Sequence, residues 1–208
     1  MGICCSINKE SIHDNSGKKS EIKLAEIKIN SSLEEKTDDL ETLKKADYTI
    51  NEFSLKDNKM YGKPVYVYDG DTLHIVFKIN NNLVKFNCRM MGIDSPEIVP
   101  KNITDKAKRD AEIKSAIKSR NYLIEKITNQ TYQEEKVSKQ DIKEFLSKCQ
   151  NVIWVHCLEF DKYGRLLVEI YKNPSDKISI NQQMINDKMA LSYDGGTKTK
   201  FDENNFKV

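Results

Sequence analysis

The chain has 208 residues and a mass of 24.1 kDa, which suits one domain with an additional segment and is too short for two domains of ordinary size. Its 34 basic and 32 acidic side chains leave a net charge of only +2, so bulk charge does not by itself indicate a nucleic-acid binder. A membrane-spanning helix needs about 18 consecutive apolar residues, and because no stretch approaches this we do not expect an integral membrane protein.

Cysteine and arginine usage are the informative parts of the composition. The cysteines are odd in number and lack the CxxC spacing of zinc knuckles, which favours a reducing compartment; they are Cys4, Cys5, Cys88, Cys149 and Cys157. The 34 basic residues include only four arginines, namely Arg89, Arg109, Arg120 and Arg165. A chain this biased to lysine is expected to keep arginine where the planar guanidinium matters.

Residues 1–6 read Met-Gly-Ile-Cys-Cys-Ser and fit the pattern for myristoylation of Gly2. One myristoyl chain holds a protein only marginally on a bilayer, so palmitoylation of Cys4 or Cys5 would supply the second anchor. No secretory signal is present, since charge begins at Lys9. We therefore expect a protein bound by lipids to the cytoplasmic face of a membrane and not secreted; the alternative is a chance Gly2 with two unmodified thiols.

Residues 7–60 form the next segment, which is rich in Ser, Asn, Lys, Glu and Asp and poor in aromatic residues. This composition is typical of a flexible linker. A short helix is possible after Ser32, which makes a capping-box pattern with Glu35. The domain is expected at residues 61–208.

From residue 64 the pattern of apolar residues changes to the period of two that predicts strands, first at 64–67 and 73–79, then at 83–91. The cluster Asn80-Asn81-Asn82 predicts a turn between the second and third strands. His74 alternates with apolar positions and is expected at an edge or surface position of its strand.

Helical spacing follows at residues 104–127, and a second helix is indicated from Ser138, whose side chain is positioned to cap it with Asp141 three residues on. Strands resume at 152–160 and 165–171 around a turn at 161–164, and a short final helix is indicated at 180–190. The predicted fold is α+β and mainly β: a five-stranded barrel of the OB type with two to three helices. The basic residues of the first helix are expected on a solvated face, with contact to a nucleic-acid backbone as the alternative; they are Lys106, Lys108, Arg109, Lys114, Lys118 and Arg120.

Four acidic residues lie at predicted strand ends beside glycine or proline: Asp69 and Asp71 in Tyr-Asp-Gly-Asp-Thr, and Asp94 and Glu97 in Gly-Ile-Asp-Ser-Pro-Glu. Ca²⁺ takes several oxygen ligands, so two carboxylates facing each other with a backbone carbonyl would make half a site. Water and substrate would complete the shell.

Arg89 precedes the second acidic motif, and Arg165 follows the turn at 161–164. Two guanidinium groups could converge there on one anion. A metal ion, a carboxylate and paired guanidinium groups are what phosphodiester hydrolysis requires, because the phosphate must be polarised, a water activated and the transition-state charge stabilised.

Three motifs in this order, Asp-Gly-Asp-Thr, Arg-x-x-x-x-Asp-Ser-Pro-Glu and Asp-Lys-Tyr-Gly-Arg, resemble the staphylococcal nuclease (thermonuclease) family over residues 64–194. The resemblance implies an OB-type barrel and a Ca²⁺-dependent nuclease that acts on DNA and RNA and leaves 3′-phosphate ends. It also assigns roles to the matching residues. Asp71 and Asp94 would bind Ca²⁺ through their carboxylates, and Ser95 would bind it through its backbone carbonyl.

The same resemblance makes Glu97 the general base or the residue that orients the attacking water. Arg89 and Arg165 would bind the scissile phosphate and its transition state. Lys162 and Tyr163 would contact a terminal phosphate, and Tyr193 would stack on a base.

The chain departs from the family pattern in three places. Ser95 stands where the family usually has threonine. Between Leu123 and Val152 the chain has roughly 25 additional residues, which include a helical insertion at about 126–150. The segment after Gly196 is too short for the full final helix of the family. The rival hypothesis is an OB-type module that binds single strands without cutting them. The acidic set argues against it, since carboxylates repel phosphate unless a metal intervenes. No feature of the sequence indicates a protein partner.

Overall fold

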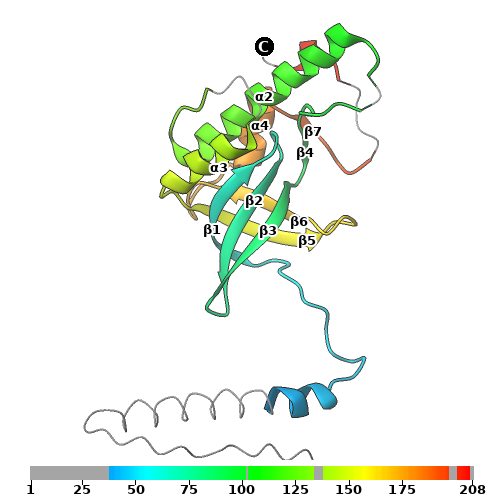
Figure 1. The fold of residues 1–208 in the computed structure, drawn as a ribbon, viewed down its shortest axis with the longest axis vertical. Coiled ribbons are helices and arrows are strands. Elements are labelled where there is room, and N and C mark those ends of the chain that lie inside the picture. Colours follow the sequence, from blue (N-terminus) through cyan, green and yellow to red (C-terminus); the bar gives the residue numbers. More distant parts are fainter. Residues whose placement is uncertain (1–37, 102, 134–137, 197–200, 207–208) are drawn as a thin grey trace, which may run out of the picture. The chain divides into compact units, whose positions relative to one another are not determined.

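A computed structural model describes residues 38–101, 103–133, 138–196 and 201–206 (Figure 1). The chain divides into two compact units, residues 1–52 and Phe53–Val208. In the first unit, residues 38–44 form a helix. The predicted acylation sites Gly2, Cys4 and Cys5 lie outside the described residues. The second unit carries the barrel, and its buried core already includes Leu55.

Five strands close the barrel in the order β1-β2-β3-β6-β5, with bounds β1 Lys59–Val67, β2 Thr72–Ile79, β3 Asn82–Met90, β5 Ile153–Phe160 and β6 Leu166–Tyr171. Neighbouring strands are antiparallel except β3 and β6, which pair in parallel from Cys88↔Leu166 to Met90↔Val168. This closed mixed barrel with its helices confirms the predicted fold class.

Alternation along the strands builds the barrel core. Leu73, Ile75 and Phe77 of β2 point inward and are almost fully buried, while the residues between them face outward. His74 is one of these outward residues. It lies on a central strand and not on an edge strand, but it is partly exposed on the outer face of the barrel, in agreement with the surface position expected as the alternative.

Helices cover one end of the barrel in Figure 1: α2 (Lys106–Thr128), α3 (Lys139–Lys148) and α4 (Ile180–Asn186). Asp105 caps α2 by accepting from the Lys108 N–H, and Ser138 caps α3 as predicted, accepting from the Asp141 N–H. A two-stranded sheet of β4 (Ile93–Asp94) and β7 (Leu191–Ser192) and a 3₁₀ turn, η1 (Glu203–Asn205), complete the described elements. None of the described helices has the length and apolar character that crossing a membrane requires.

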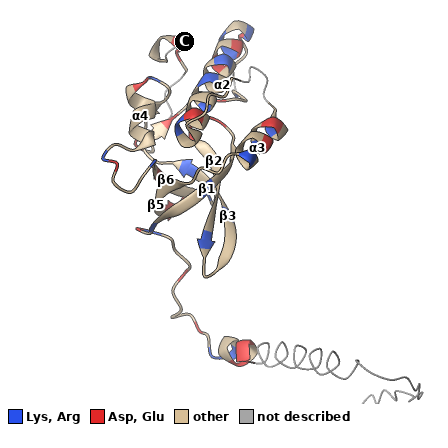
Figure 2. Cartoon of the chain, turned by 90° about the vertical axis from the view of Figure 1, so that its left-hand side faces the viewer, with Lys and Arg blue, Asp and Glu red and all other residues tan. Residues whose placement is uncertain are grey.

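The basic residues of α2 do not all lie on a solvated face. Arg109 is exposed, but Arg120 is fully buried, and its Nε and Nη2 atoms donate to Asn121 Oδ1 at 3.1 and 2.9 Å. The expectation for Arg120 was therefore wrong, because the helix turns this position toward the core. Figure 2 shows acidic and basic residues mixed along α2.

Candidate active site

The site begins at the turn between β1 and β2. Asp69 is buried, and its Oδ1 accepts from the backbone N–H groups of Asp71 and Thr72 at 3.1 and 2.8 Å. Burial and then the charge of Asp71 raise the pKa of Asp69 well above its usual value. Gly70 packs so closely that an added Cβ would lie 2.8 Å from Ser95 Cβ and 1.8 Å from the hydroxyl of Ser119 on α2. The turn is thus held between two other parts of the unit.

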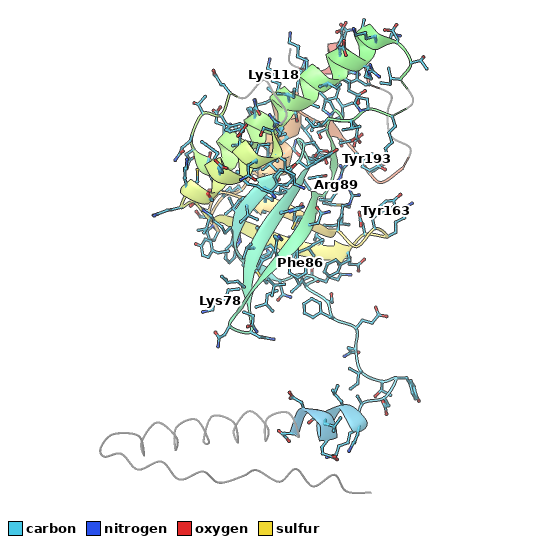
Figure 3. All side chains as sticks on the ribbon, in the orientation of Figure 1. Lys78, Phe86, Arg89, Lys118, Tyr163 and Tyr193 are labelled. Atoms are coloured by element: carbon cyan, nitrogen blue, oxygen red, sulfur yellow. The ribbon has the colours of Figure 1, made fainter. Side chains whose placement is uncertain are left out.

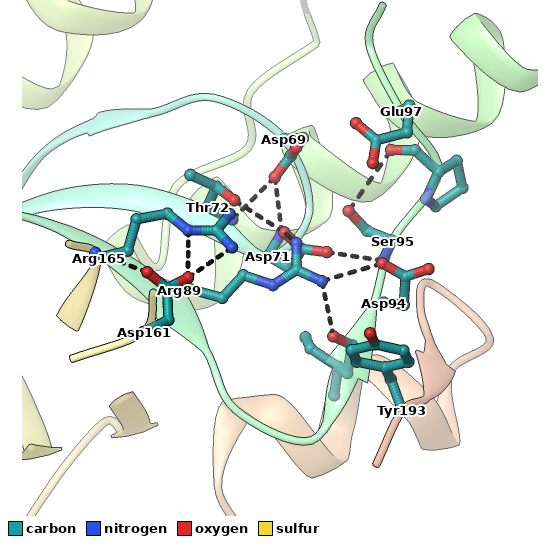
Figure 4. Close-up of polar contacts among 12 residues, drawn as sticks. Asp69, Asp71, Thr72, Arg89, Asp94, Ser95, Glu97, Asp161, Arg165 and Tyr193 are labelled. Carbon is teal, nitrogen blue, oxygen red and sulfur yellow. Dashed lines mark hydrogen bonds and ion pairs between the residues drawn. The ribbon is translucent and has the colours of Figure 1, made fainter. Parts of the chain in front are cut away.

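Arg89 joins the two predicted metal-binding carboxylates. Its Nη1 donates to Asp71 Oδ1, and its Nη2 donates to Asp94 Oδ1 at 2.9 Å and to the Ile93 carbonyl at 3.2 Å (Figure 4). The Ser95 N–H donates to the second oxygen of Asp71 at 2.8 Å. Burial opposes the charge on Arg89, but Asp71 and Asp94 outweigh it and raise its pKa. One guanidinium therefore holds both carboxylates together.

Backbone pairing brings these residues from separate segments to one place. The Met90 N–H at the end of β3 donates to the Asp71 carbonyl at 2.8 Å. Gly92, with φ of +79°, then turns the chain so that β4 presents Asp94, and the Tyr193 N–H donates to the Gly92 carbonyl at 3.0 Å. Tyr193, predicted only from the resemblance, thus lies beside the turn that positions Asp94.

The second arginine is set by the turn between β5 and β6. Asp161 Oδ2 accepts from Nε and Nη2 of Arg165, each at 2.7 Å, and Asp161 Oδ1 accepts from the backbone N–H groups of Tyr163 and Arg165. Burial alone would raise the pKa of Asp161, but these bonds from Arg165 and Tyr163 lower it. Asp161 stays ionised and fixes the orientation of the Arg165 guanidinium.

A cavity of about 1160 Å³ brings together the predicted catalytic and substrate-binding residues, of which Figure 3 labels Arg89, Tyr163 and Tyr193. It is lined by Arg89, Glu97 and Arg165, and also by Lys162, Tyr163 and Tyr193. The predicted metal ligands Asp71, Asp94 and Ser95 are not among the residues that line it. Tyr163 is 72% exposed, and both the Lys162 amine and the Arg165 guanidinium lie over its ring, at 5.2 and 5.5 Å from the centroid. Glu97 is half-buried, and its backbone N–H donates to Glu112 Oε1 at 3.2 Å.

The fit of a metal can be judged from the donor set. Among the described residues, no group of three or more acidic, histidine or cysteine side chains is arranged to hold a metal ion. Asp71 and Asp94 nevertheless share one cation, the guanidinium of Arg89, and the Ser95 backbone lies against Asp71. Carboxylate and carbonyl oxygens suit a hard divalent cation. Asp71 and Asp94 thus have the donor chemistry for part of a Ca²⁺ shell, whereas Ser95 is shown contacting Asp71 through its N–H and not through its carbonyl.

Two residues of the site were missed or left without a role in the sequence analysis. Asp161 was placed only in a turn, and its ion pair with Arg165 was not predicted. Asp69 was noted as acidic, but nothing in the sequence shows that it is buried and shapes the turn that carries Asp71.

A closed five-stranded mixed barrel with helices at one end places the chain in the class of OB-like α+β folds. The family model described as staphylococcal nuclease homologue matches residues 87–207, more than half of the chain, and the chain therefore belongs to this family. A search of curated proteins found no match. Family membership supports a nuclease or a nucleic-acid-binding module.

Proposed function

We propose that this protein is a Ca²⁺-dependent nuclease that hydrolyses phosphodiester bonds of DNA, RNA or both. One observation carries the proposal: Arg89, Glu97 and Arg165 line the same cavity, and Arg89 forms ion pairs with Asp71 and Asp94. A site that only bound nucleic acid would gain nothing from three carboxylates beside a phosphate.

In the proposed reaction, Glu97 accepts a proton from a water molecule as the water oxygen attacks phosphorus. The new oxygen–phosphorus bond forms, the bond from phosphorus to the 5′-oxygen of the leaving nucleotide breaks, and that oxygen takes up a proton. The products are a 3′-phosphate and a 5′-hydroxyl, so no redox partner is needed. General-base assistance of this kind contributes about 10²–10⁴-fold to a rate.

The two arginines would stabilise the charge that grows on the non-bridging oxygens of the phosphate. Arg165 donates from Nε and Nη2 to Asp161, and a guanidinium group has further N–H donors that would bind a phosphate. Such preorganised donors act most strongly where charge develops in the transition state.

Ca²⁺ would be held by the carboxylates of Asp71 and Asp94 and the carbonyl of Ser95, and when bound it neutralises charge on the phosphate and polarises water. Lys162 and Tyr163 would contact a terminal phosphate of the substrate, and Tyr193 would stack on a base. Since these three residues line the same cavity as Arg165, one substrate can reach them together.

Cleavage by the full chain tests the proposed roles. We predict that Glu97→Gln and Arg165→Ala each lower kcat/KM on single-stranded DNA with Ca²⁺ by at least about 100-fold, because each removes a group that acts on the transition state. Glu203→Gln and Arg109→Ala are matched controls, since both residues are exposed and lie outside the cavity lining. Variants that fold, retain single strands and cut as fast as the wild type would contradict these roles.

We also propose that the protein is tethered to the cytoplasmic face of a membrane by myristoyl and palmitoyl groups on Gly2 and on Cys4 or Cys5. The support is the sequence pattern alone. Mass spectrometry of the protein made in eukaryotic cells should show the acyl masses on the N-terminal peptide. An unmodified Gly2 with unmodified Cys4 and Cys5 would overturn the tether and leave the nuclease proposal untouched.

A further inference from the structure

The cavity continues beyond the predicted catalytic residues, along the outer face of the barrel. Its lining also includes Tyr66, His74 and Asn87, together with Lys139 of α3. Tyr66 pairs with His74 across β1 and β2, and His74 pairs with Asn87 across β2 and β3, so these side chains form one row over three strands. The next row toward the catalytic residues on the same face contains Arg89.

Helix α3 supplies one wall of this extension. The Lys139 amine lies 5.4 Å from the centre of the Tyr66 ring, and that ring meets the His74 imidazole edge-on, with centroids 5.3 Å apart. Tyr66 is buried and Lys139 is exposed, so the ring supports the ammonium group at the rim of the cavity. The additional residues that distinguish this chain from the family pattern thus place a positive charge in the cavity.

Two further lysines lie near Lys139 and His74: Lys85 is the next outward position to Asn87 on β3, and Lys143 is on α3, although neither is among the residues that line the cavity. Burial first, and then the positive charges of Lys85, Lys139 and Lys143, lower the pKa of His74. Lys143 follows Lys139 by one helical turn, and Lys85 lies on β3. All three are exposed, and within the described part of the chain none of them has an ion-pair partner. We call Lys85, Lys139 and Lys143 the His74 lysine cluster.

The cluster and Arg89 lie at different points along the outer face of the barrel. Lys85 and Arg89 are four residues apart on one face of β3, a separation of about 13 Å along an antiparallel strand. In Figure 1, α3 and the turn between β5 and β6 that carries Lys162 and Tyr163 lie on opposite sides of the β2–β3 hairpin. A ligand that reaches both the cluster and Arg89 must therefore be a chain of several phosphates.

We propose that the His74 lysine cluster is a second phosphate-binding subsite, which holds the single-stranded polynucleotide away from the bond that is cut, on the side opposite Lys162 and Tyr163. The subsite rests on the proposed function, since its ligand is the nuclease substrate. Helix α3 then extends the substrate groove and favours polymers over short fragments.

The salt dependence of binding tests the subsite directly. Binding of the full chain to a fluorescent single strand of about 12 nucleotides is measured by anisotropy in EDTA, where cleavage cannot interfere. Two lost phosphate contacts reduce the slope of log affinity against log salt by about 1.4 for single strands. We expect this change in Lys139→Ala/Lys143→Ala but not in the charge-matched control Lys172→Ala/Lys177→Ala, whose residues are exposed and outside the cavity lining.

In practical terms, the affinity of the wild type should fall about sevenfold more than that of Lys139→Ala/Lys143→Ala between 50 and 200 mM salt, as that slope difference requires. Lys139→Arg/Lys143→Arg should restore the wild-type slope, which a merely structural role of the helix would not explain. In Ca²⁺, kcat/KM of the alanine variant should fall at least about fivefold more on the oligonucleotide than on a dinucleotide too short to reach the cluster.

The outcomes separate this proposal from the proposed function. A slope for the alanine variant equal to that of the lysine control would overturn the subsite, whether or not the protein cuts. Absence of cutting by the wild type, with the slope difference intact, would overturn the nuclease and support the cluster as a binding site.

Discussion

Arg89 offsets the negative charge of two neighbouring carboxylates, Asp71 and Asp94. Asp71 is 1% exposed, and Asp94 lies beside it, so two carboxylates must be held close together away from bulk water. The planar guanidinium donates to both through different nitrogens, which a lysine amine could not do in the same geometry. The rarity of arginine in this chain singled out Arg89 and Arg165, which the structure places in the lining of one cavity, but it also singled out Arg120, which is buried on α2.

Asp161 is the residue that positions Arg165, and its removal should affect rate more than stability. We predict that Asp161→Ala lowers kcat on single-stranded DNA about tenfold or more, because the guanidinium loses the carboxylate that fixes it. Asp161→Asn keeps one oxygen for the backbone N–H groups of Tyr163 and Arg165 and should lose less. Measurements of kcat, KM and thermal unfolding for the three proteins check this.

A loss confined to KM, or equal losses of stability and rate in both variants, would show that Asp161 merely holds the turn. Sequence reasoning reached Arg165 and the turn but not this pairing, since the pattern Asp-Lys-Tyr-Gly-Arg does not say which way the aspartate points.

At the scale of elements, α4 secures the parallel pair of strands through one buried amide. Asn181 accepts from the Ile170 N–H at 3.0 Å and donates to the carbonyls of Met91 and Val168 at 2.9 and 3.0 Å. It therefore connects β6 to the segment that follows β3, just before the turn that presents Asp94. Parallel strands cannot share a hairpin, so an additional connection of this kind holds in place the segment that carries Asp94.

We predict that Asn181→Ala destabilises the protein by about 3 kcal/mol, because it leaves buried backbone groups without hydrogen bonds. For a protein of this size the unfolding temperature should fall by about 6–12 °C. Gln182→Ala is the control, since Gln182 is exposed on the same helix and should change stability by less than about 0.5 kcal/mol. An equal effect of both substitutions in thermal unfolding would contradict the role of Asn181.

The long elements could be predicted because their patterns are local. The alternation of apolar and polar residues predicted the β2–β3 hairpin, and the capping pattern of Ser138 correctly predicted the start of α3. The sheet of β4 and β7 was not expected, because two residues are too few for any periodic pattern. The parallel pairing of β3 with β6 could not be predicted either, because it joins residues nearly 80 positions apart and depends on closure of the barrel.

At the scale of the whole molecule, the site is assembled from the ends of several elements around one cavity. The β1–β2 turn, the end of β3 and the β5–β6 turn each contribute one of the three motifs seen in the sequence. Barrel closure explains why the three motifs meet, and the chemistry that they predict for the site is the subject of the experiments proposed above. The cavity wall formed by α3 could not be predicted, because the contact of Lys139 with Tyr66 depends on how the insertion folds back onto β1.

Ca²⁺ should stabilise the full chain if the carboxylate pair receives it. A ligand at about 100 times its Kd contributes about 2.7 kcal/mol, and this should raise the unfolding temperature by roughly 5–10 °C. Asp71→Asn should abolish the shift, whereas the control Asp202→Asn should retain it, since Asp202 is exposed and only caps η1. Thermal unfolding with Ca²⁺ or EDTA checks the prediction, and an unchanged temperature for the wild type would exclude Ca²⁺ binding at this pair.

The most direct test of the central claim is incubation of the full chain with a 5′-labelled single-stranded DNA in Ca²⁺ or in EDTA, followed by mass spectrometry of the fragments. We predict cutting in Ca²⁺ only, with a phosphate on the 3′ end of each labelled fragment. Intact DNA in Ca²⁺, bound by a folded protein, would contradict the nuclease and identify the chain as a binding module.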